Sequence, residues 1–195
     1  MESNILENYN FIDCPCDGKY LIHPIQQLGD DLIGIEMGVH KAKTFCTILQ
    51  NCPNVKMLYG IDSYQPYNDY LSKDGTETLQ FQFGKKDVEY FKLTAIHNIE
   101  WSGCKERAGL YLQDSNEVAS QIEDESIDFI FLDAWMTSEQ IANDLRVWYP
   151  KIKKGGLFSG HDYGIQVQTE LDKFFKEISI SPRVSKFDLT FMWYK

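Results

Sequence analysis

The feature that most constrains the fold is a repeated order of two patterns along the chain. Short apolar runs that end in an acid or a small polar turn alternate with longer segments of helical periodicity. This order is typical of βαβ units and predicts an α/β fold with a mainly parallel sheet. In open sheets of this kind, ligands bind outside the carboxyl ends of the strands. The expected strands are residues 31–37, 56–62, 108–114, 126–134 and 156–162.

The other segments fit a single domain over residues 1–195, a length that suits one hydrophobic core. A short helix is expected at 18–29, interrupted at Pro24, within an N-terminal covering segment over residues 1–30. The tail 181–195 alternates as a terminal strand or hairpin does. Further helices are expected at residues 41–52, 85–101, 138–152 and 168–178.

Residues 62–84 form the longest segment without a clear period. The segment is polar and rich in aromatic residues, and it follows the carboxyl end of an expected strand. Long irregular loops in compact domains are commonly functional lids. We therefore expect a lid over the ligand cleft, in which Tyr64, Tyr67 and Tyr70 either contact the ligand or pack within the loop.

The net charge of −10 disfavours two classes of partner. Nucleic acids and anionic membrane surfaces both require a basic face on the protein. No apolar run approaches the roughly 18 residues that a membrane helix needs, and the first residues lack the pattern of a secretory signal. The odd number of cysteines, five, indicates free thiols in a reducing compartment. We expect a cytoplasmic protein without a nucleic-acid or membrane partner.

The stretch "GIEMGVHKAKT" after the first expected strand indicates which ligand the sheet binds. Gly38 lets a ligand approach the backbone, and the helix N-terminus behind it favours polar or anionic groups. A dinucleotide site would show G-x-G-x-x-G, whereas this turn contains a single glycine. Glu36 would repel a pyrophosphate and attract an ammonium group, unless it only caps the following helix. This combination favours S-adenosylmethionine, which carries an ammonium and a sulfonium but no phosphate.

Asp62 supports a nucleoside ligand without identifying it. It ends the second expected strand, 24 residues after Gly38. An acid about 20 residues after the glycine turn typically binds ribose hydroxyls. Both S-adenosylmethionine and a nicotinamide dinucleotide contain a ribose, and a simple turn role for Asp62 is the alternative.

Several stretches, taken in order, resemble class I S-adenosylmethionine-dependent methyltransferases. The resemblance is to the small Rossmann-like group that includes macrolide sugar O-methyltransferases and relatives of catechol O-methyltransferase. "IGIEMGVHKAKT" is similar to the first motif of the family and "YGIDSYQPY" to the second, while "LYLQDSNEVASQI" resembles the segment beside the adenine. The resemblance implies a Rossmann-like sheet of seven mostly parallel strands, with helices on both faces and the last strand antiparallel.

The turn and the resemblance together define an expected cofactor site. Asp114 and Ser115 would lie beside the adenine, although Asp114 also suits the N-cap of the next helix and the two roles are compatible. Trp135 would stack on the adenine or line the substrate cleft. The expected cofactor-binding residues are Glu36, Gly38, His40, Asp62, Ser63, Asp114, Ser115, Asp133 and Trp135.

Three positions depart from the pattern of the family. Ala42 stands where a third glycine is usual, but it is small enough to preserve the packing of helix on strand. Gln113 stands where many members have glycine. The segment after the fourth strand usually reads Asp-Gly-x-His, and here it reads "DAWM", so no histidine follows Asp133. A catalytic role that depends on that histidine is therefore not expected.

The chemistry of methyl transfer indicates a second group of residues. The reaction is an in-line displacement that needs an aligned acceptor, and a hydroxyl acceptor must also lose its proton. Asp133 ends the fourth expected strand, and His161 with Asp162 ends the fifth. Two carboxylates suffice to hold Mg²⁺ when waters complete its shell, so Asp133 and Asp162 are the expected metal ligands. His161 would be a third ligand or a base, and all three residues are the expected catalytic group.

The preferred hypothesis is an enzyme that methylates a small hydroxylated acceptor, such as a sugar or a catechol-like ring. A nicotinamide-dependent oxidoreductase would share the strand order and Asp62, but the missing glycines and Glu36 count against it. A module that binds S-adenosylmethionine without catalysis is the third possibility. The aromatic tail would either close the sheet of its own chain or pair across a homodimer.

Overall fold

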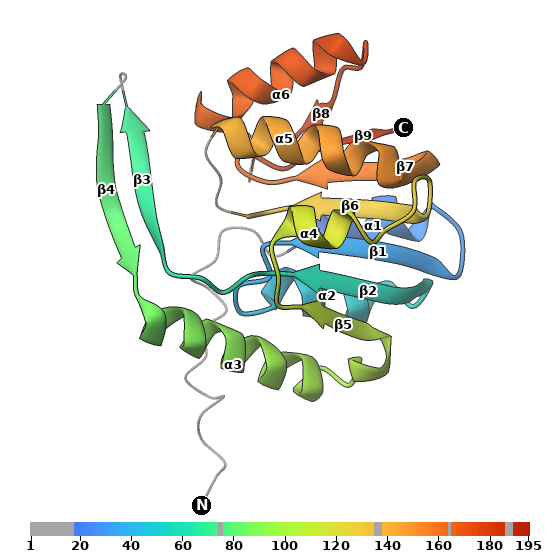
Figure 1. Cartoon of the computed structure of the whole chain (residues 1–195). Helices are drawn as coiled ribbons and strands as arrows, with labels where there is room; N and C mark the ends of the chain where they lie inside the picture. Colours follow the sequence, from blue (N-terminus) through green and yellow to red (C-terminus); the bar gives the residue numbers. More distant parts are fainter. Residues whose placement is uncertain (1–17, 74–75, 135–137, 164, 186–188) are drawn as a thin grey trace, which may run out of the picture.

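The computed structural model describes residues 18–73, 76–134, 138–163, 165–185 and 189–195. Their main element is a seven-stranded sheet in the order β5-β2-β1-β6-β7-β9-β8. The first five strands of this order are parallel, whereas β9 runs antiparallel to both of its neighbours. Helices cover both faces of the sheet (Figure 1). The predicted Rossmann-like fold, with an antiparallel last strand, is confirmed.

The parallel strands follow the apolar runs of the sequence. Nearly every residue of β1 and β6 is buried, as expected for strands covered on both faces. The strand β7 begins four residues earlier than predicted and includes the segment around Gly155, which was predicted to be a turn. Gly155 has a left-handed φ of +79°, and the pairing with β6 is irregular across this segment. The strands of the main sheet are β1 (Leu32–Met37), β2 (Val55–Ile61), β5 (Ala108–Tyr111), β6 (Ile127–Leu132), β7 (Ile152–Gly160), β8 (Arg183–Val184) and β9 (Phe191–Tyr194).

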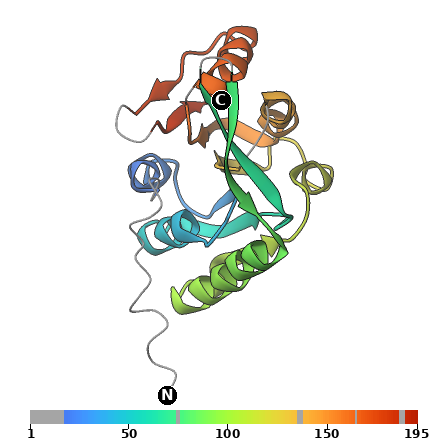
Figure 2. The same ribbon diagram turned by 90° about the vertical axis from the view of Figure 1, so that its left-hand side faces the viewer.

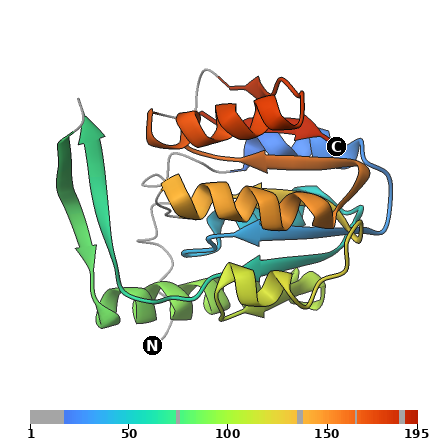
Figure 3. The ribbon, with the colours of Figure 1, turned by 45° about the horizontal axis from the view of Figure 1, so that its top comes forward.

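The helices form one layer on each face of the sheet. Figure 3 shows the second of these layers in front of the sheet. No helix among the described residues is both long and apolar enough to cross a membrane. The first layer consists of α1 (Lys19–Gln26), α2 (Lys43–Asn51) and α3 (Lys85–Trp101), and the second of α4 (Ser115–Ala119), α5 (Ser138–Trp148) and α6 (Ile165–Glu177).

The helix α1 continues through Pro24, which was predicted to interrupt it. A proline inside a helix loses one hydrogen bond and crowds the preceding turn. Here the cost is offset by burial, because Leu21 and Ile25 lie in the core against α2. The side chain of Gln26 also donates to the carbonyl of Asn51 at 2.8 Å, which fixes the end of α1 beside the end of α2.

The tail forms an antiparallel hairpin of β8 and β9, and β9 pairs with β7. Trp193 stacks on Phe158 of β7, with ring centroids 4.5 Å apart. A Cβ on Gly160 would lie 2.3 Å from the ring of Phe191, so the last residue of β7 is pressed directly against the tail. The tail therefore closes the sheet of its own chain, which is one of the two roles expected for it.

Residues 62–84 are not an irregular loop, and this prediction was wrong. They contain an antiparallel hairpin of β3 (Tyr67–Lys73) and β4 (Thr76–Phe83). The sequence "TETLQFQF" alternates polar and apolar residues, and an Asp-Gly pair joins the two strands, which is a hairpin signal. Figures 1 and 2 show the hairpin standing apart from the main sheet, across the side where the parallel strands end.

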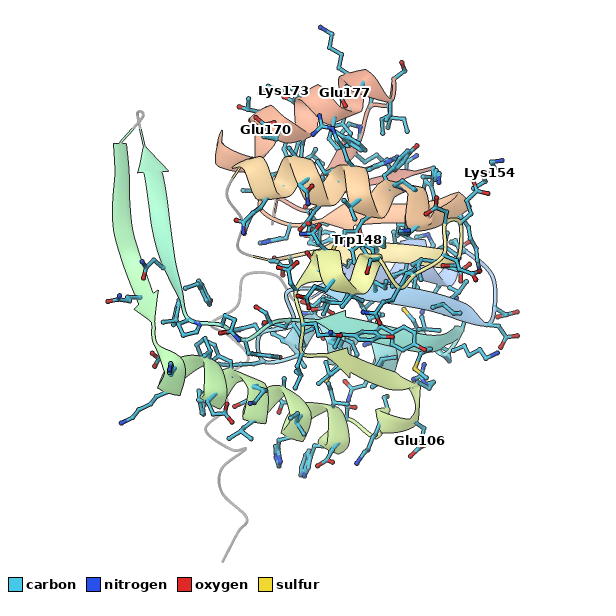
Figure 4. All side chains as sticks on the ribbon, in the orientation of Figure 1. Glu106, Trp148, Lys154, Glu170, Lys173 and Glu177 are labelled. Atoms are coloured by element: carbon cyan, nitrogen blue, oxygen red, sulfur yellow. The ribbon has the colours of Figure 1, made fainter. Side chains whose placement is uncertain are left out.

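The core has one apolar cluster beneath each helix layer. Trp148 of α5, labelled in Figure 4, is fully buried in the second cluster. In the first cluster, Gly34 of β1 leaves room for the ring of Phe129 of β6. A Cβ on Gly34 would lie 2.0 Å from Cζ of Phe129. The absence of a side chain at residue 34 therefore sets how closely β1 and β6 pack at the centre of the sheet.

We predict that Gly34→Ala lowers the free energy of unfolding by about 2–3 kcal/mol, because the new methyl group overlaps a fully buried ring. Phe129→Leu should relieve that overlap. The double variant should therefore lose at least about 1 kcal/mol less than the sum of the single changes. Urea unfolding of the four proteins measures this coupling, and strictly additive losses would contradict the proposed overlap.

Candidate active site

The parallel strands bring the predicted site residues to one edge of the sheet. Backbone hydrogen bonds continue the ladder one residue beyond the strands, so that each strand end is held against its neighbour. These bonds run from Asp62 N–H to Tyr111 O (3.0 Å), from Gly38 N–H to Ile61 O (2.9 Å), from Asp133 N–H to Met37 O (2.8 Å) and from His161 N–H to Leu132 O (3.0 Å).

Gly38 occupies the narrowest point of this edge. Its φ of +86° lies in the left-handed region that favours glycine. A Cβ at this position would lie 2.3 Å from the carbonyl oxygen of Asp133 and 2.6 Å from Cα of Ala134. The chain therefore requires glycine here for two independent reasons, one of backbone conformation and one of space.

Asp62 holds the turn that follows Gly38. Its Oδ2 accepts from His40 N–H at 2.9 Å, and its Oδ1 accepts from Tyr64 N–H at 2.8 Å. The hydroxyl of Tyr64 donates to the carbonyl of His40 at 2.9 Å, which ties the two segments together again. Burial raises the pKa of Asp62, although these backbone donors oppose the shift. A carboxylate accepts about four hydrogen bonds, so the turn role and a ribose role are compatible.

Ala42 has a backbone reason for its place in the turn, in addition to its small size. Its φ is +61°, in the left-handed region, and it is fully buried directly before α2. A left-handed conformation costs a non-glycine residue roughly 1–2 kcal/mol. This explains why a glycine suits the position.

Glu36 is almost completely buried, with 1% of its surface exposed. It does not cap α2, since that helix has no side-chain cap and begins after Ala42. Among the described residues, Oε2 of Glu36 has no hydrogen-bond partner. Burial, followed by the nearby charges of Asp133 and Asp62, raises the pKa of Glu36 well above its ordinary value. A cation bound beside this carboxyl would remove both the repulsion and the missing contact.

The three predicted catalytic residues come together at the ends of β6 and β7. Nδ1 of His161 lies 3.0 Å from Oδ1 of Asp162 and 3.5 Å from Oδ1 of Asp133. One ligand atom from each residue lies within 4.8 Å of the other two, which is compatible with a shared metal ion. Burial alone would lower the pKa of His161, but the two carboxylates outweigh it and raise that pKa to about 10.

The segment predicted to lie beside the adenine has a further acid behind it. Asp114 caps α4 by accepting from Asn116 N–H at 2.9 Å, which confirms its predicted capping role. The hydroxyl of Ser115 donates to Asp144 of α5 at 3.2 Å. Burial, opposed by this hydrogen bond and reinforced by Asp114, raises the pKa of Asp144 to about 6. The burial of Asp144 was not predicted, since an acid within an amphipathic helix gives no signal of burial in the sequence.

The other expected residues differ in how the structure places them. Ser63 is half-buried directly after Asp62. The ring of His40 packs edge-on against Phe91 of α3, with centroids 4.2 Å apart. Trp135, the last expected cofactor residue, lies outside the described residues. Among the described cysteines, Cys46, Cys52 and Cys104 are free, as predicted.

The comparisons with known proteins agree with this geometry. The family model of a methyltransferase domain matches residues 35–163, from within β1 to just beyond β7. The match covers well over half of the sequence, and the chain therefore belongs to the methyltransferase family. The class I methyltransferase predicted from the sequence is confirmed, and with it an enzyme that depends on S-adenosylmethionine. No curated protein sequence matches the chain.

Solved structures share the fold at low sequence identity. An O-methyltransferase from Bacillus cereus in complex with SAH has a TM-score of 0.61 at 14% identity, over 93% of this chain and 82% of that one. A SAM-dependent O-methyltransferase from Thermotoga maritima has a TM-score of 0.60 at 16% identity, over 87% of this chain and 53% of that one. A precorrin 8W decarboxylase from Methanobacterium thermoautotrophicum has a TM-score of 0.58 at 14% identity, over 90% of this chain and 88% of that one. The fold therefore does not identify the acceptor, which has to be argued from the site.

We predict that Gly38→Ala destabilises the protein by at least about 2 kcal/mol more than Gly103→Ala does. Both glycines have a left-handed φ, +86° and +74°, so both variants carry the backbone cost. A Cβ meets the carbonyl of Asp133 only at residue 38, because nothing lies within 4 Å at residue 103. Thermal and urea unfolding compare the two variants, and equal losses would show that the close approach is not limiting.

We predict that Asp144→Asn stabilises the protein by on the order of 1–3 kcal/mol at pH 7–8, with a gain that disappears near pH 4. The pKa of about 6 in the folded state lies above that of the unfolded chain. As the pH rises from the pKa of the unfolded chain to that of the folded state, ionisation of Asp144 therefore increasingly opposes folding. The amide of Asn cannot ionise, so the variant does not carry this cost.

Urea unfolding at a series of pH values measures this effect of residue 144. Asn keeps an oxygen that accepts from Ser115, so the hydrogen bond is preserved. Asp30→Asn, at an exposed position, is the control and should change little at any pH. A gain in stability at residue 144 that does not vary with pH would contradict the raised pKa.

Proposed function

We propose that the protein transfers a methyl group from S-adenosylmethionine to a hydroxyl group of a small acceptor. The observation that carries this proposal is the buried carboxyl of Glu36, close to the turn at Gly38. Its Oε2 has no hydrogen-bond partner among the described residues. This arrangement suits a ligand with an ammonium group. It disfavours a pyrophosphate, which would meet an acid and a turn with only one glycine.

The cofactor would extend along the carboxyl edge of the sheet. Glu36 would bind the ammonium group at the centre, and Asp62 would accept from the ribose hydroxyls with the capacity that its backbone donors leave. Ser63 follows Asp62 on the same segment. Asp114 and Ser115, at the end of β5, would lie beside the adenine. This order uses the neighbouring ends of β1, β2 and β5.

The group of Asp133, His161 and Asp162 would serve the acceptor. Two carboxylates and an imidazole within 4.8 Å fit a divalent cation, and the two carboxylates suit Mg²⁺ or Mn²⁺. A bound cation would lower the pKa of an acceptor hydroxyl and fix its orientation. The carboxylates also offer acceptors for the hydroxyl proton, so these residues can orient the acceptor in either case. A hydroxyl group on the acceptor would need both functions of these residues, the orientation of its oxygen and the removal of its proton.

The β3–β4 hairpin is proposed as the lid of the site. A shallow pocket of about 440 Å³ lies at its base, lined by Pro66, Tyr67, Asn68, Gln82, Phe83 and Gly84. Phe83 contacts Phe91 of α3, which in turn contacts His40 of the cofactor turn. This chain of rings supports a role for the hairpin base next to the cofactor, where part of the acceptor would be held.

Two further expectations remain part of this proposal, namely a single domain over residues 1–195 and a cytoplasmic location.

The competing function is a protein that binds S-adenosylmethionine but does not catalyse transfer. That alternative predicts cofactor binding without product formation on any hydroxylated acceptor. The grouping of Asp133, His161 and Asp162 favours the enzyme, because cofactor binding by itself would not need it.

The proposed cofactor site is tested by calorimetric titration of S-adenosylhomocysteine into the full chain, in two buffers of different ionisation enthalpy. Glu36→Gln should weaken binding at least about 10-fold, because a charge-assisted hydrogen bond is worth about 1.5–3 kcal/mol. Burial raises the pKa of Glu36, and an ammonium group bound beside it would lower that pKa, so binding should release a proton at a pH between the free and bound values. That release should be absent in Glu36→Gln.

The controls separate this site from others. Asp62→Asn should also weaken binding, whereas Glu117→Gln, at an exposed position on α4, should not. NADH should not bind in a parallel titration. Titrations of Mg²⁺ and Mn²⁺ into the protein and into Asp133→Asn test the metal separately. Failure of S-adenosylhomocysteine to bind, or binding that is unchanged in Glu36→Gln, would overturn the proposed cofactor site.

A further inference from the structure

We propose that the outer face of α3 is a self-complementary surface on which two copies of the chain pair as an antiparallel, two-fold symmetric dimer. The proposal does not depend on the function of the active site. Its basis is the side chains that α3 turns away from the sheet. Figures 1 and 2 show α3 along the outer edge of the fold, beyond α2 and β5.

The outer face of α3 is unusually apolar for a surface. The described residues include eight exposed large apolar side chains, and four of them lie on this helix. The exposed fraction is 72% for Trp101, 57% for Leu93, 50% for Tyr90 and 38% for Ile96. Val88, Phe91, Ala95 and Ile99 are buried on the opposite side of the helix. A helix that is apolar on two sides is expected to be covered on both.

The exposed residues recur at the spacing of a helix–helix seam. Lys86, Leu93 and Glu100 are separated by seven residues each, so they lie on one line along the helix. Tyr90 and Ile96 flank this line, three residues before and three residues after Leu93. The seam extends over most of α3, whose 17 residues span roughly 25 Å.

The outer face of α3 is complementary to the same face of a second copy when the two helices run antiparallel and both Leu93 side chains lie at the two-fold axis. Residues at equal distances on either side of Leu93 then face each other across the two-fold axis. Tyr90 meets Ile96 of the second copy, and both contacts are apolar. Lys86 meets Glu100 of the second copy, which is a pair of opposite charges. Each contact occurs twice because of the symmetry.

The next positions continue the same complementarity. Glu89 and His97 of the second copy lie at the same height along the seam, four residues from Leu93 in opposite directions. Glu89 and Glu100 already pair within the chain, with Lys92 at 2.6 Å and Lys105 at 2.7 Å. Exposed pairs of this kind contribute little, so they can be shared or exchanged on association. A parallel arrangement would instead place Lys86 near Lys86 and Glu100 near Glu100.

The occupant is therefore a second copy of the chain. An interface formed mainly by one helix from each copy is at the small end of specific interfaces. We expect a concentration-dependent dimer with a dissociation constant on the order of micromolar. The aromatic tail was the other segment expected to form a dimer, but it pairs with β7 of its own chain.

The experiment is sedimentation velocity of the full chain over a concentration range from about 1 to about 300 µM, which brackets the affinity expected for a small interface. The wild type should dimerise within this range. Leu93→Glu should be monomeric throughout. Lys86→Glu should weaken the dimer at least about 10-fold, because it places like charges together twice. The double variant Lys86→Glu with Glu100→Lys should restore the wild-type affinity.

Two control variants fix the position of the interface. Tyr194→Glu changes an exposed aromatic residue of the tail, and Lys176→Glu reverses an exposed charge on α6. Both should dimerise as the wild type does. Far-ultraviolet circular dichroism checks that each variant is folded. A wild type that stays monomeric, a dimer that is lost in Tyr194→Glu but kept in Leu93→Glu, or a double variant as weak as Lys86→Glu would overturn the proposal.

Discussion

The structure of the site depends on the close approach of two backbones at Gly38. The turn after β1 lies against the carbonyl of Asp133 at the end of β6. Gly38 N–H donates to the carbonyl of Ile61 at the end of β2. Because no side chain separates these strand ends, three acids converge on one short edge. Burial, followed by the charges of Asp133 and Asp62, raises the pKa of Glu36. The edge therefore carries an excess of negative charge that a positively charged ligand would balance.

A sequence pattern predicts the centre of this fold better than its periphery. The apolar runs of β1 and β6 are buried on both faces, so their signal is strong and their positions were predicted within two residues. The position of Gly38 and Asp62 was also predicted, because residues that directly follow parallel strands lie at the carboxyl edge of the sheet. Both residues lie at this edge in the structure.

The failures have physical causes that lie outside a local pattern. Among the described residues, β3 and β4 form a separate two-stranded sheet. Many residues of this hairpin are polar, so the alternation of its second strand is weak in the sequence. Asp144 of α5 is buried and accepts a hydrogen bond from Ser115 of α4, which is a tertiary contact that no local pattern records. The left-handed backbone of Ala42 likewise follows from the way the turn is held by Asp62 and Tyr64.

The pairing of β9 with β7 has a consequence for the order in which the protein assembles. His161 directly follows Gly160, and Gly160 is pressed against Phe191, which is 31 residues further along the chain. Until residues 191–194 have been synthesised and have docked, β7 remains an unpaired edge and the backbone that carries His161 is held from one side alone. The proposed cofactor residues at the ends of β1, β2 and β5 all precede β7 in the chain. The residues proposed to face the acceptor are therefore the last part of the site whose backbone is fixed on both sides.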